Sequence, residues 1–103
     1  MEKMCILMHP LDNVATVLQD THINDHLCIV DGEKNLVGEI TAAEEIPFAH
    51  KICLRPVPQR SFVMKFGVVI GRASAEIPAG GYAHIHNIVS IQGSENVVRG
   101  GSV

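Results

Sequence analysis

The chain has 103 residues, of which 47% are hydrophobic and 18% charged, and its formal net charge is −3 at pH 7. This length and composition predict one small folded domain rather than a disordered segment. The negative net charge argues against nucleic acid or an anionic membrane as a partner. No apolar run approaches the roughly 20 residues of a membrane span, and the N-terminus is not typical of a signal peptide. We therefore expect a cytoplasmic location.

Short apolar segments with turn signals between them begin near the N-terminus. Residues 4–8 (MCILM) predict a short buried strand, and residues 14–18 predict a strand or a short helix. The segment 27–30 is a clear strand candidate, with its hairpin partner beginning at residue 36. The pair Asp31–Gly32 between them is typical of a type I′ turn.

The second half of the chain continues this pattern. Residues 41–45 could form one helical turn before Pro47. Further strands are predicted over 50–57, 61–67, 68–74 and 82–91. No segment shows a sustained apolar period of 3.6 residues, so the sequence favours a compact all-β domain over residues 1–90. Residues 91–103 lose the pattern and predict a mobile C-terminal tail.

A weak internal repeat runs through this pattern. Gly38 precedes Glu-Ile-Pro at 45–47 and a histidine-bearing segment, and Gly71 precedes Glu-Ile-Pro at 76–78 and another one. The repeat predicts two β-loop-β units, in each of which a proline stiffens the loop that presents a histidine.

The three cysteines are odd in number, lie in apolar contexts and form no CxxC pair: Cys5, Cys28 and Cys53. This pattern predicts buried, reduced thiols rather than a disulfide or a zinc site.

His84 and His86 are the first candidate site residues. If the segment around them is a strand, their side chains share one face. Two such imidazoles can chelate a metal or bind an anion. The alternative is a half-exposed strand that carries two histidines on its polar face. Asn87 could orient an imidazole or bind a hydroxyl, or it could be a turn residue.

His50 and Lys51 follow the proline-stiffened segment EIPFA. A histidine beside a lysine suits carboxylate recognition, because both can donate hydrogen bonds to an anion. A solvated surface loop explains the same residues. Lys65 fits either an anion site or an outward-facing strand position.

A second cluster, His22, Asp25 and His26, has a spacing that could chelate a metal on a helical turn. The connector that carries these residues is polar throughout, which favours solvated loop residues instead. No phosphate-binding glycine loop and no serine nucleophile motif is present.

Two stretches together, EIPFAHKICL and FVMKFGVVIGRASAEIPAGGYAHIHN, resemble the small domain of the altronate/galactarate dehydratase family. They are also similar to the small subunit of sulfolactate sulfo-lyase. The family pattern maps onto roughly residues 30–88, and it keeps the two lysines and three histidines His50, Lys51, Lys65, His84 and His86. The chain departs from the pattern at Ala49 (usually Gly), Cys53 (Ala), Phe66 (Tyr) and Ala83 (Val).

The resemblance implies a SAF-like β-clip fold. It also implies elimination of water, or of sulfite, from a 2-hydroxy acid, with a divalent metal, usually iron, held mainly by a much larger domain or subunit. In that setting His84 and His86 would be catalytic residues or metal ligands. The substrate-binding residues would be His50, Lys51, Lys65 and Asn87. We expect a small subunit or detached domain that caps the pocket of a large catalytic subunit over a sugar acid.

Two other functions stay open. The chain could bind sugar acids without catalysis, or it could only assemble, including with a second copy through unpaired strand edges. Catalysis by this chain alone is not expected, because a thin β domain has little room to enclose the ~300 Å³ that a substrate pocket needs.

Overall fold

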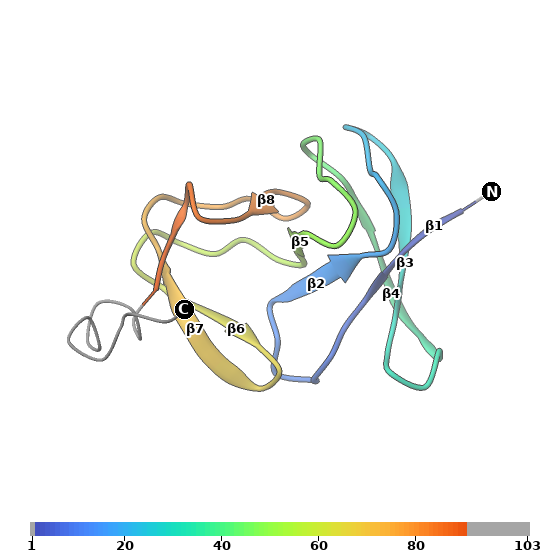
Figure 1. Cartoon of the computed structure of the whole chain (residues 1–103), viewed down its shortest axis with the longest axis horizontal. Coiled ribbons are helices and arrows are strands. Elements are labelled where there is room, and N and C mark those ends of the chain that lie inside the picture. The colour runs from blue at the N-terminus through green and yellow to red at the C-terminus, as the bar shows by residue number, and fades with distance from the viewer. Residues whose placement is uncertain (1, 91–103) are drawn as a thin grey trace.

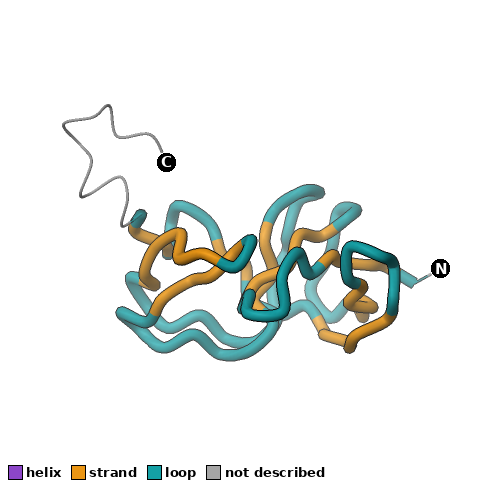
Figure 2. Tube along the Cα trace, turned by 90° about the horizontal axis from the view of Figure 1, so that it is seen from below, coloured by secondary structure: helices purple, strands orange, loops and turns teal. Residues whose placement is uncertain are grey.

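Residues 2–90, the part of the chain that the computed structural model describes, form nine strands and no helix (Figures 1 and 2). The strands are β1 (Lys3–Ile6), β2 (Val14–Val17), β3 (His26–Val30), β4 (Leu36–Thr41), β5 (Lys51–Cys53), β6 (Phe62–Lys65), β7 (Val68–Ala73), β8 (Tyr82–Ala83) and β9 (Ile88–Val89). The prediction of an all-β domain is confirmed. The predicted tail, 91–103, lies outside the described residues. No described helix could cross a membrane.

The strands form two sheets: in Figure 1 β1, β3 and β4 of the larger sheet lie on the right, and β6 and β7 of the smaller sheet lie on the left. The larger has the order β4-β3-β1-β2-β5-β8, and the smaller has the order β6-β7-β9. β1 and β3 are parallel, whereas the other paired strands are antiparallel. This arrangement of short strands in two sheets is consistent with a SAF-like β-clip.

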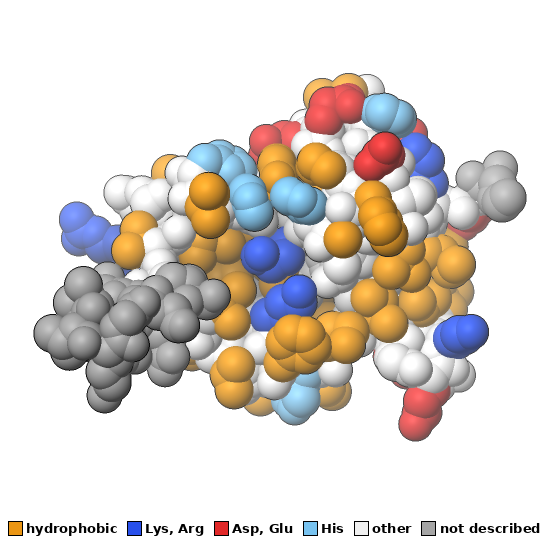
Figure 3. All heavy atoms as spheres, in the orientation of Figure 1, with side chains coloured by type: hydrophobic (Ala, Val, Ile, Leu, Met, Phe, Trp, Pro, Cys, Tyr) orange, Lys and Arg blue, Asp and Glu red, His pale blue; other side chains and the backbone are white. Residues whose placement is uncertain are grey.

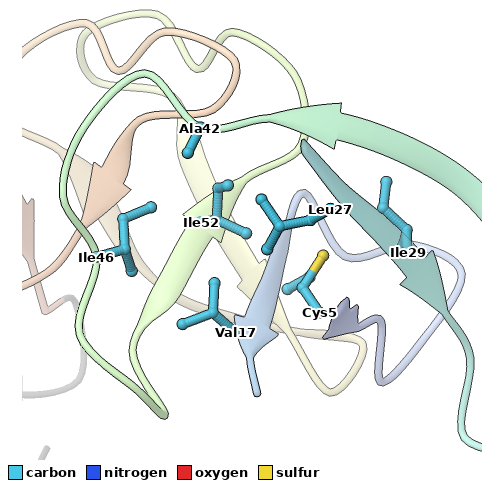
Figure 4. Packing of buried hydrophobic residues seen from close by; sticks show 8 residues of the cluster. Cys5, Val17, Leu27, Ile29, Ala42, Ile46 and Ile52 are labelled. Atoms are coloured by element: carbon cyan, nitrogen blue, oxygen red, sulfur yellow. The ribbon is translucent and has the colours of Figure 1, made fainter. Parts of the chain in front are cut away.

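The described residues form two small hydrophobic cores. The first is built from Cys5, Ala15, Val17, Leu27, Ile29, Ala42, Ile46 and Ile52, most of which point toward one another in Figure 4. The second is built from Val14, Cys53, Val57, Val63, Ala73, Ile77 and Ala83. β2 and β5 contribute to both cores, because successive side chains of a strand point to opposite faces. Ile52 enters the first core and Cys53 the second.

Four turns of the same kind connect the strands. In each turn the first carbonyl accepts a hydrogen bond from the fourth backbone N–H, over residues 22–25, 47–50, 58–61 and 78–81. The third residue always has a positive φ: 74° at Asn24, 75° at Ala49, 74° at Arg60 and 83° at Gly80. A positive φ at this position is the mark of a type II turn. Both Glu-Ile-Pro segments of the predicted repeat lead into such turns.

The four turns pair into two similar units. A β-bridge joins Thr21 to Ile46 at the start of the first two turns, and another joins Val57 to Ile77 at the start of the last two. The sequence repeat identified only one turn of each pair. The turn at 22–25 has no proline, and the segment leading into 58–61 has no Glu-Ile-Pro.

Three local predictions are wrong. Residues 41–45 form no helical turn, because the backbone N–H of Ala42 and Ala43 bonds to distant carbonyls of Asp25 and Gly80. Gly32 does not have positive φ; the Asp31 carboxylate instead caps a longer loop in which Lys34 has a φ of 70°. The first strand is not fully buried, since Met4 is 41% exposed.

Candidate functional site

His50 and His84 face each other where β5 meets β8. The antiparallel register places Lys51 opposite Ala83 and Ile52 opposite Tyr82. One step further along this register, His50 comes opposite His84. The two ring centroids are 4.7 Å apart. The proline-led turn at 47–50 delivers His50 to this point, as the sequence predicted, because the backbone N–H of His50 closes that turn.

His84 and His86 do not lie on one strand, so the predicted geometry of alternating strand faces is wrong. β8 ends at Ala83, and the carbonyl of His84 accepts hydrogen bonds from the N–H groups of Asn87 and Ile88 at 3.0 and 2.9 Å. The side chain of Asn87 closes this turn. Its Oδ1 accepts from the His84 N–H at 2.9 Å, and its Nδ2 donates to the Tyr82 carbonyl at 2.8 Å. These two bonds give Asn87 the turn role.

Tyr82 brings all three histidines of the cluster together. The centroid of its ring lies 5.6 Å from that of His50, 5.5 Å from that of His84 and 5.2 Å from that of His86, and it stacks on the His84 ring. Its hydroxyl lies 2.6 Å from Nδ1 of His50. Tyr82 is not among the site residues predicted from the sequence. The signal for it was its position two residues before His84, at the start of the predicted strand.

Lys51 and Lys65 add positive charge to this region. Histidine and Lys/Arg side chains gather at the middle of one face of the molecule in Figure 3. Lys51 begins β5 and is half-buried; burial, and then the charge of Lys65, lower its pKa from the ordinary value. Lys65 ends β6, and its Nζ lies 5.1 Å from the centroid of the Phe66 ring.

The hairpin that carries Lys65 is anchored by a buried carboxylate. Asp12 is 1% exposed, and its two oxygens accept the backbone N–H of Phe66 at 2.9 Å and of Gly67 at 2.8 Å. Phe66 and Gly67 have φ angles of 58° and 76°, the signature of a type I′ turn. The neighbouring Asn13 bonds to the backbone of β6. Neither Asp12 nor Asn13 is among the site residues predicted from the sequence.

The electrostatics of the cluster suit an anion. The pKa of His84 is lowered, first by burial and then by the positive charges of His50, Lys51 and His86. A bound carboxylate or sulfonate would offset this accumulation of like charge. The histidines have two donors each when protonated and the lysines three, so the cluster can make several charge-assisted hydrogen bonds to one anion.

A metal ion fits these residues poorly. Among residues 2–90, no group of three or more His, Cys, Asp or Glu side chains is arranged to hold a metal ion. The side chains of the candidate metal cluster contact separate partners: Asp25 forms an ion pair with Lys3, His22 Nδ1 lies 2.7 Å from Glu45 Oε1, and His26 Nε2 lies 3.0 Å from Glu39 Oε1. His84 and His86 as ligands of a metal held mainly by another protein stay a prediction.

The cysteines are free, as predicted. Cys5 and Cys53 are buried, and burial raises the pKa of each thiol to about 12. Cys28 is only half-buried, which corrects the prediction, and its Sγ donates to a Glu2 carboxylate oxygen at 2.6 Å. Thiols held in the protonated form are poor nucleophiles, so we assign them no chemistry.

The family model of the altronate/galactarate dehydratase SAF domain matches residues 3–91. The chain belongs to this family. It is 34% identical to the altronate dehydratase of Escherichia coli K12 over 84 residues, which cover 80% of this chain and 15% of that enzyme. It is 33% identical to (2R)-sulfolactate sulfo-lyase subunit alpha of Paracoccus pantotrophus over 61 residues, covering 59% of this chain and 90% of that subunit.

The two kinds of relative differ in how much of their length this SAF-domain chain matches. A galactarate dehydratase of Escherichia coli K12 is 31% identical over 77 residues, which is 13% of that enzyme. The chain thus spans less than a fifth of the dehydratases but nearly the whole of a sulfo-lyase subunit. The name of the latter describes one subunit of a multi-subunit enzyme.

Proposed function

We propose that this SAF domain is the small component of a lyase that acts on a sugar acid of the altronate or galactarate type. It would cap the active site of a larger catalytic subunit or domain. The observation that carries the proposal is the convergence of His50, His84 and His86 on Tyr82 beside two lysines. The names of the relatives support elimination from a hydroxy acid as the reaction class.

The residues of the cluster suit distinct parts of such a reaction. Removal of water from a 2-hydroxy acid needs a base for the proton next to the carboxylate and an acid for the departing hydroxyl. Lys51 and Lys65 would hold the substrate carboxylate and stabilise the negative charge that develops there. His84, with its lowered pKa, is neutral at pH 7 and can accept a proton. A divalent metal, usually iron in this family, would be held by the larger partner and would supply Lewis acidity.

Apolar side chains support the placing of the larger partner on this face. Three large hydrophobic residues within two positions of members of the cluster in the sequence are exposed: Phe48 (59%), Phe66 (58%) and Ile85 (83%). Exposed apolar side chains around a polar centre are typical of a protein interface. A catalytic partner that covers them would also exclude water from the cluster and strengthen its electrostatic interactions.

Sulfolactate sulfo-lyase is the second candidate, supported by the match to 90% of the subunit alpha of Paracoccus pantotrophus and to 62% of that of Chromohalobacter salexigens. In that case sulfite rather than water would leave, and the cluster would contact a sulfonate or a carboxylate. Both candidates use the same cationic cluster, so the substrate distinguishes them.

The test is reconstitution of this chain with a large subunit of the dehydratase type, assayed separately with altronate, galactarate and sulfolactate. Turnover with a sugar acid and none with sulfolactate supports the dehydratase; the reverse supports the sulfo-lyase. His84→Ala and His86→Ala should each lower kcat/KM, by roughly 10²- to 10⁴-fold for a group that transfers the proton. His26→Ala is the matched control, because His26 pairs with Glu39 away from the cluster. Unchanged turnover in both variants would remove these histidines from the mechanism.

A further inference from the structure

Tyr82 occupies the centre of the cluster and has no assigned role. Its backbone is fixed on both sides: its N–H donates to Glu44 Oε2 at 3.1 Å, and its carbonyl accepts from Asn87 Nδ2 at 2.8 Å. Its strand position opposite Ile52 anchors its ring against the first core. The hydroxyl therefore reaches His50 from a held ring rather than from a freely rotating surface side chain.

The hydrogen bond between the Tyr82 hydroxyl and His50 Nδ1 is short, at 2.6 Å. It can exist in two forms, because either the hydroxyl donates to an unprotonated Nδ1 or a protonated Nδ1 donates to the hydroxyl oxygen. The chemistry of the two groups distinguishes them: a phenolic O–H is a strong donor and its oxygen a weak acceptor, whereas the lone pair of an imidazole nitrogen is a strong acceptor. The form in which the Tyr82 hydroxyl donates to Nδ1 is therefore favoured at this short separation.

A neutral imidazole has one N–H and one lone-pair nitrogen. The phenolic O–H is a good donor, and the lone pair of Nδ1 is the acceptor beside it. We propose that Tyr82 is a positioning residue: its hydroxyl donates to Nδ1 of His50 and holds that imidazole as the tautomer protonated on Nε2. The Nε2–H group of His50 is then a donor for an anionic ligand, a consequence that rests on the proposed function.

Ring stacking and hydrogen bonding can be separated in Tyr82. The ring stacks on His84 at an interplanar angle of 11° and contacts His86, and phenylalanine keeps both contacts. Tyr82→Phe removes only the hydroxyl. A merely structural role for the ring predicts no change in the protonation of His50, whereas the proposed role predicts a loss of its tautomer preference.

The experiment is a long-range ¹H–¹⁵N NMR correlation on the whole ¹⁵N-labelled chain at about pH 8, above the ordinary histidine pKa of ~6.5. The His50 signals are assigned with His50→Gln. We expect His50 to be protonated on Nε2 alone in the natural chain and to become a mixture of both tautomers in Tyr82→Phe. His26 is the internal control and should keep its pattern. Protonation of His50 on Nδ1 in the natural chain, or the same tautomer in Tyr82→Phe, would overturn the proposal.

Two features keep this test decisive. If Tyr82→Phe does not fold, the tautomer in the natural chain alone decides which group donates. The measurement needs no ligand and no large subunit, so it stands apart from the proposed function. Galactarate added to the natural chain reports the latter: a shift of the His50 Nε2 signal supports ligand contact, while its absence beside an Nε2-protonated His50 counts against the proposed function only.

Discussion

Ala49 and Gly80 hold the same position in two equivalent turns, with φ angles of 75° and 83°. Each donates its backbone N–H to a neighbouring strand, Ala49 to Val17 at 2.9 Å and Gly80 to Cys53 at 2.7 Å. Their surroundings differ. A Cβ at Gly80 would lie 2.2 Å from the Thr41 carbonyl oxygen, so only glycine fits there. Position 49 has room for the alanine side chain. The alanine destabilises the fold only through the conformational free energy of its left-handed backbone.

The substitution Ala49→Gly should stabilise the domain. A non-glycine residue in the left-handed region costs roughly 1–2 kcal/mol, of which part is offset because glycine loses more entropy on folding. A net gain of about 0.5–1 kcal/mol corresponds to a rise in Tm of about 2–8 °C for a domain of this size. Thermal unfolding followed by circular dichroism measures it.

Ala79→Gly is the matched control for this prediction. Ala79 precedes Gly80 in the equivalent turn, is exposed, and does not have a positive φ. Glycine there should lower Tm slightly, because only the entropy term remains. An unchanged or lower Tm in Ala49→Gly would show that the alanine methyl group makes packing contacts that outweigh the backbone strain.

Asp12→Ala should destabilise the fold and also disturb the site. The substitution leaves the backbone N–H groups of Phe66 and Gly67 without their buried acceptor, which costs roughly 1–3 kcal/mol for each group that water cannot reach. Because these groups form the turn beyond Lys65, the position of that lysine should become less defined. Chemical denaturation measures the loss of stability.

Asp20→Ala is the control for Asp12. Asp20 Oδ1 also accepts a backbone N–H of a site loop, that of Phe48 at 2.8 Å, but Asp20 is exposed. Water can replace the lost acceptor, so the expected cost is about 1 kcal/mol or less. Equal losses in the two variants would contradict the special role of the buried carboxylate.

The structure brings the predicted residues His50, His84 and His86 together, but by a geometry that the sequence did not predict. The turn that positions His50 could be predicted from the sequence, because Pro47 and the repeated Glu-Ile-Pro segment mark it. The end of β8 could not be predicted. Apolar and polar residues alternate over 83–86, which fits a strand, but the side chain of Asn87 ends the strand by hydrogen bonds to the backbone of Tyr82 and His84. The alternation of apolar and polar residues in the sequence does not predict these two side-chain hydrogen bonds.

Long-range contacts account for the other omissions. Asp12 lies 54 residues from Phe66 along the chain, and Tyr82 lies 32 from His50. Pairings of this kind depend on which strands and turns lie side by side in the fold, which the apolar pattern of short strands does not determine. The turns at 22–25 and 58–61 were missed because Asn24 and Arg60 adopt positive φ without a glycine to mark it.

Lys51→Met should increase the stability of the fold and weaken the binding of an anionic ligand. Burial lowers the pKa of Lys51, so at neutral pH the folded state carries a charge that its surroundings disfavour. The free-energy cost of burying the charged ammonium is absent above about pH 10.5, the pKa of lysine in the unfolded chain, and it appears as the pH falls below that value. Methionine should therefore stabilise the fold at pH 7, and this gain should vanish above about pH 10.5. The side chain is only half-buried, which limits the gain to on the order of 0.5 kcal/mol.

The binding side of the same variant is measured by calorimetry with galactarate. Removal of a charge-assisted hydrogen bond should weaken affinity about tenfold or more. Lys34→Met is the control, because Lys34 is exposed in the β3–β4 loop at the far edge of the larger sheet. Equal affinity in the natural chain and Lys51→Met would exclude Lys51 from the anion site.

Anion binding should strengthen as the pH falls through the histidine range. In the free chain the pKa of His84 lies below the ordinary value of 6.5, through burial and the charges of His50, Lys51 and His86. A bound carboxylate favours the protonated ring and raises that pKa, so binding takes up a proton between the two values. Affinity is then constant above the bound-state pKa, rises as the pH drops toward the free-state pKa, and levels off below it.

NMR titration of the His84 ring in the presence and absence of galactarate reads both pKa values, and His84→Gln should flatten the pH dependence of the affinity. An affinity that falls over this range would mean that the ligand carries no negative charge near His84, or that the cluster binds something other than an anion.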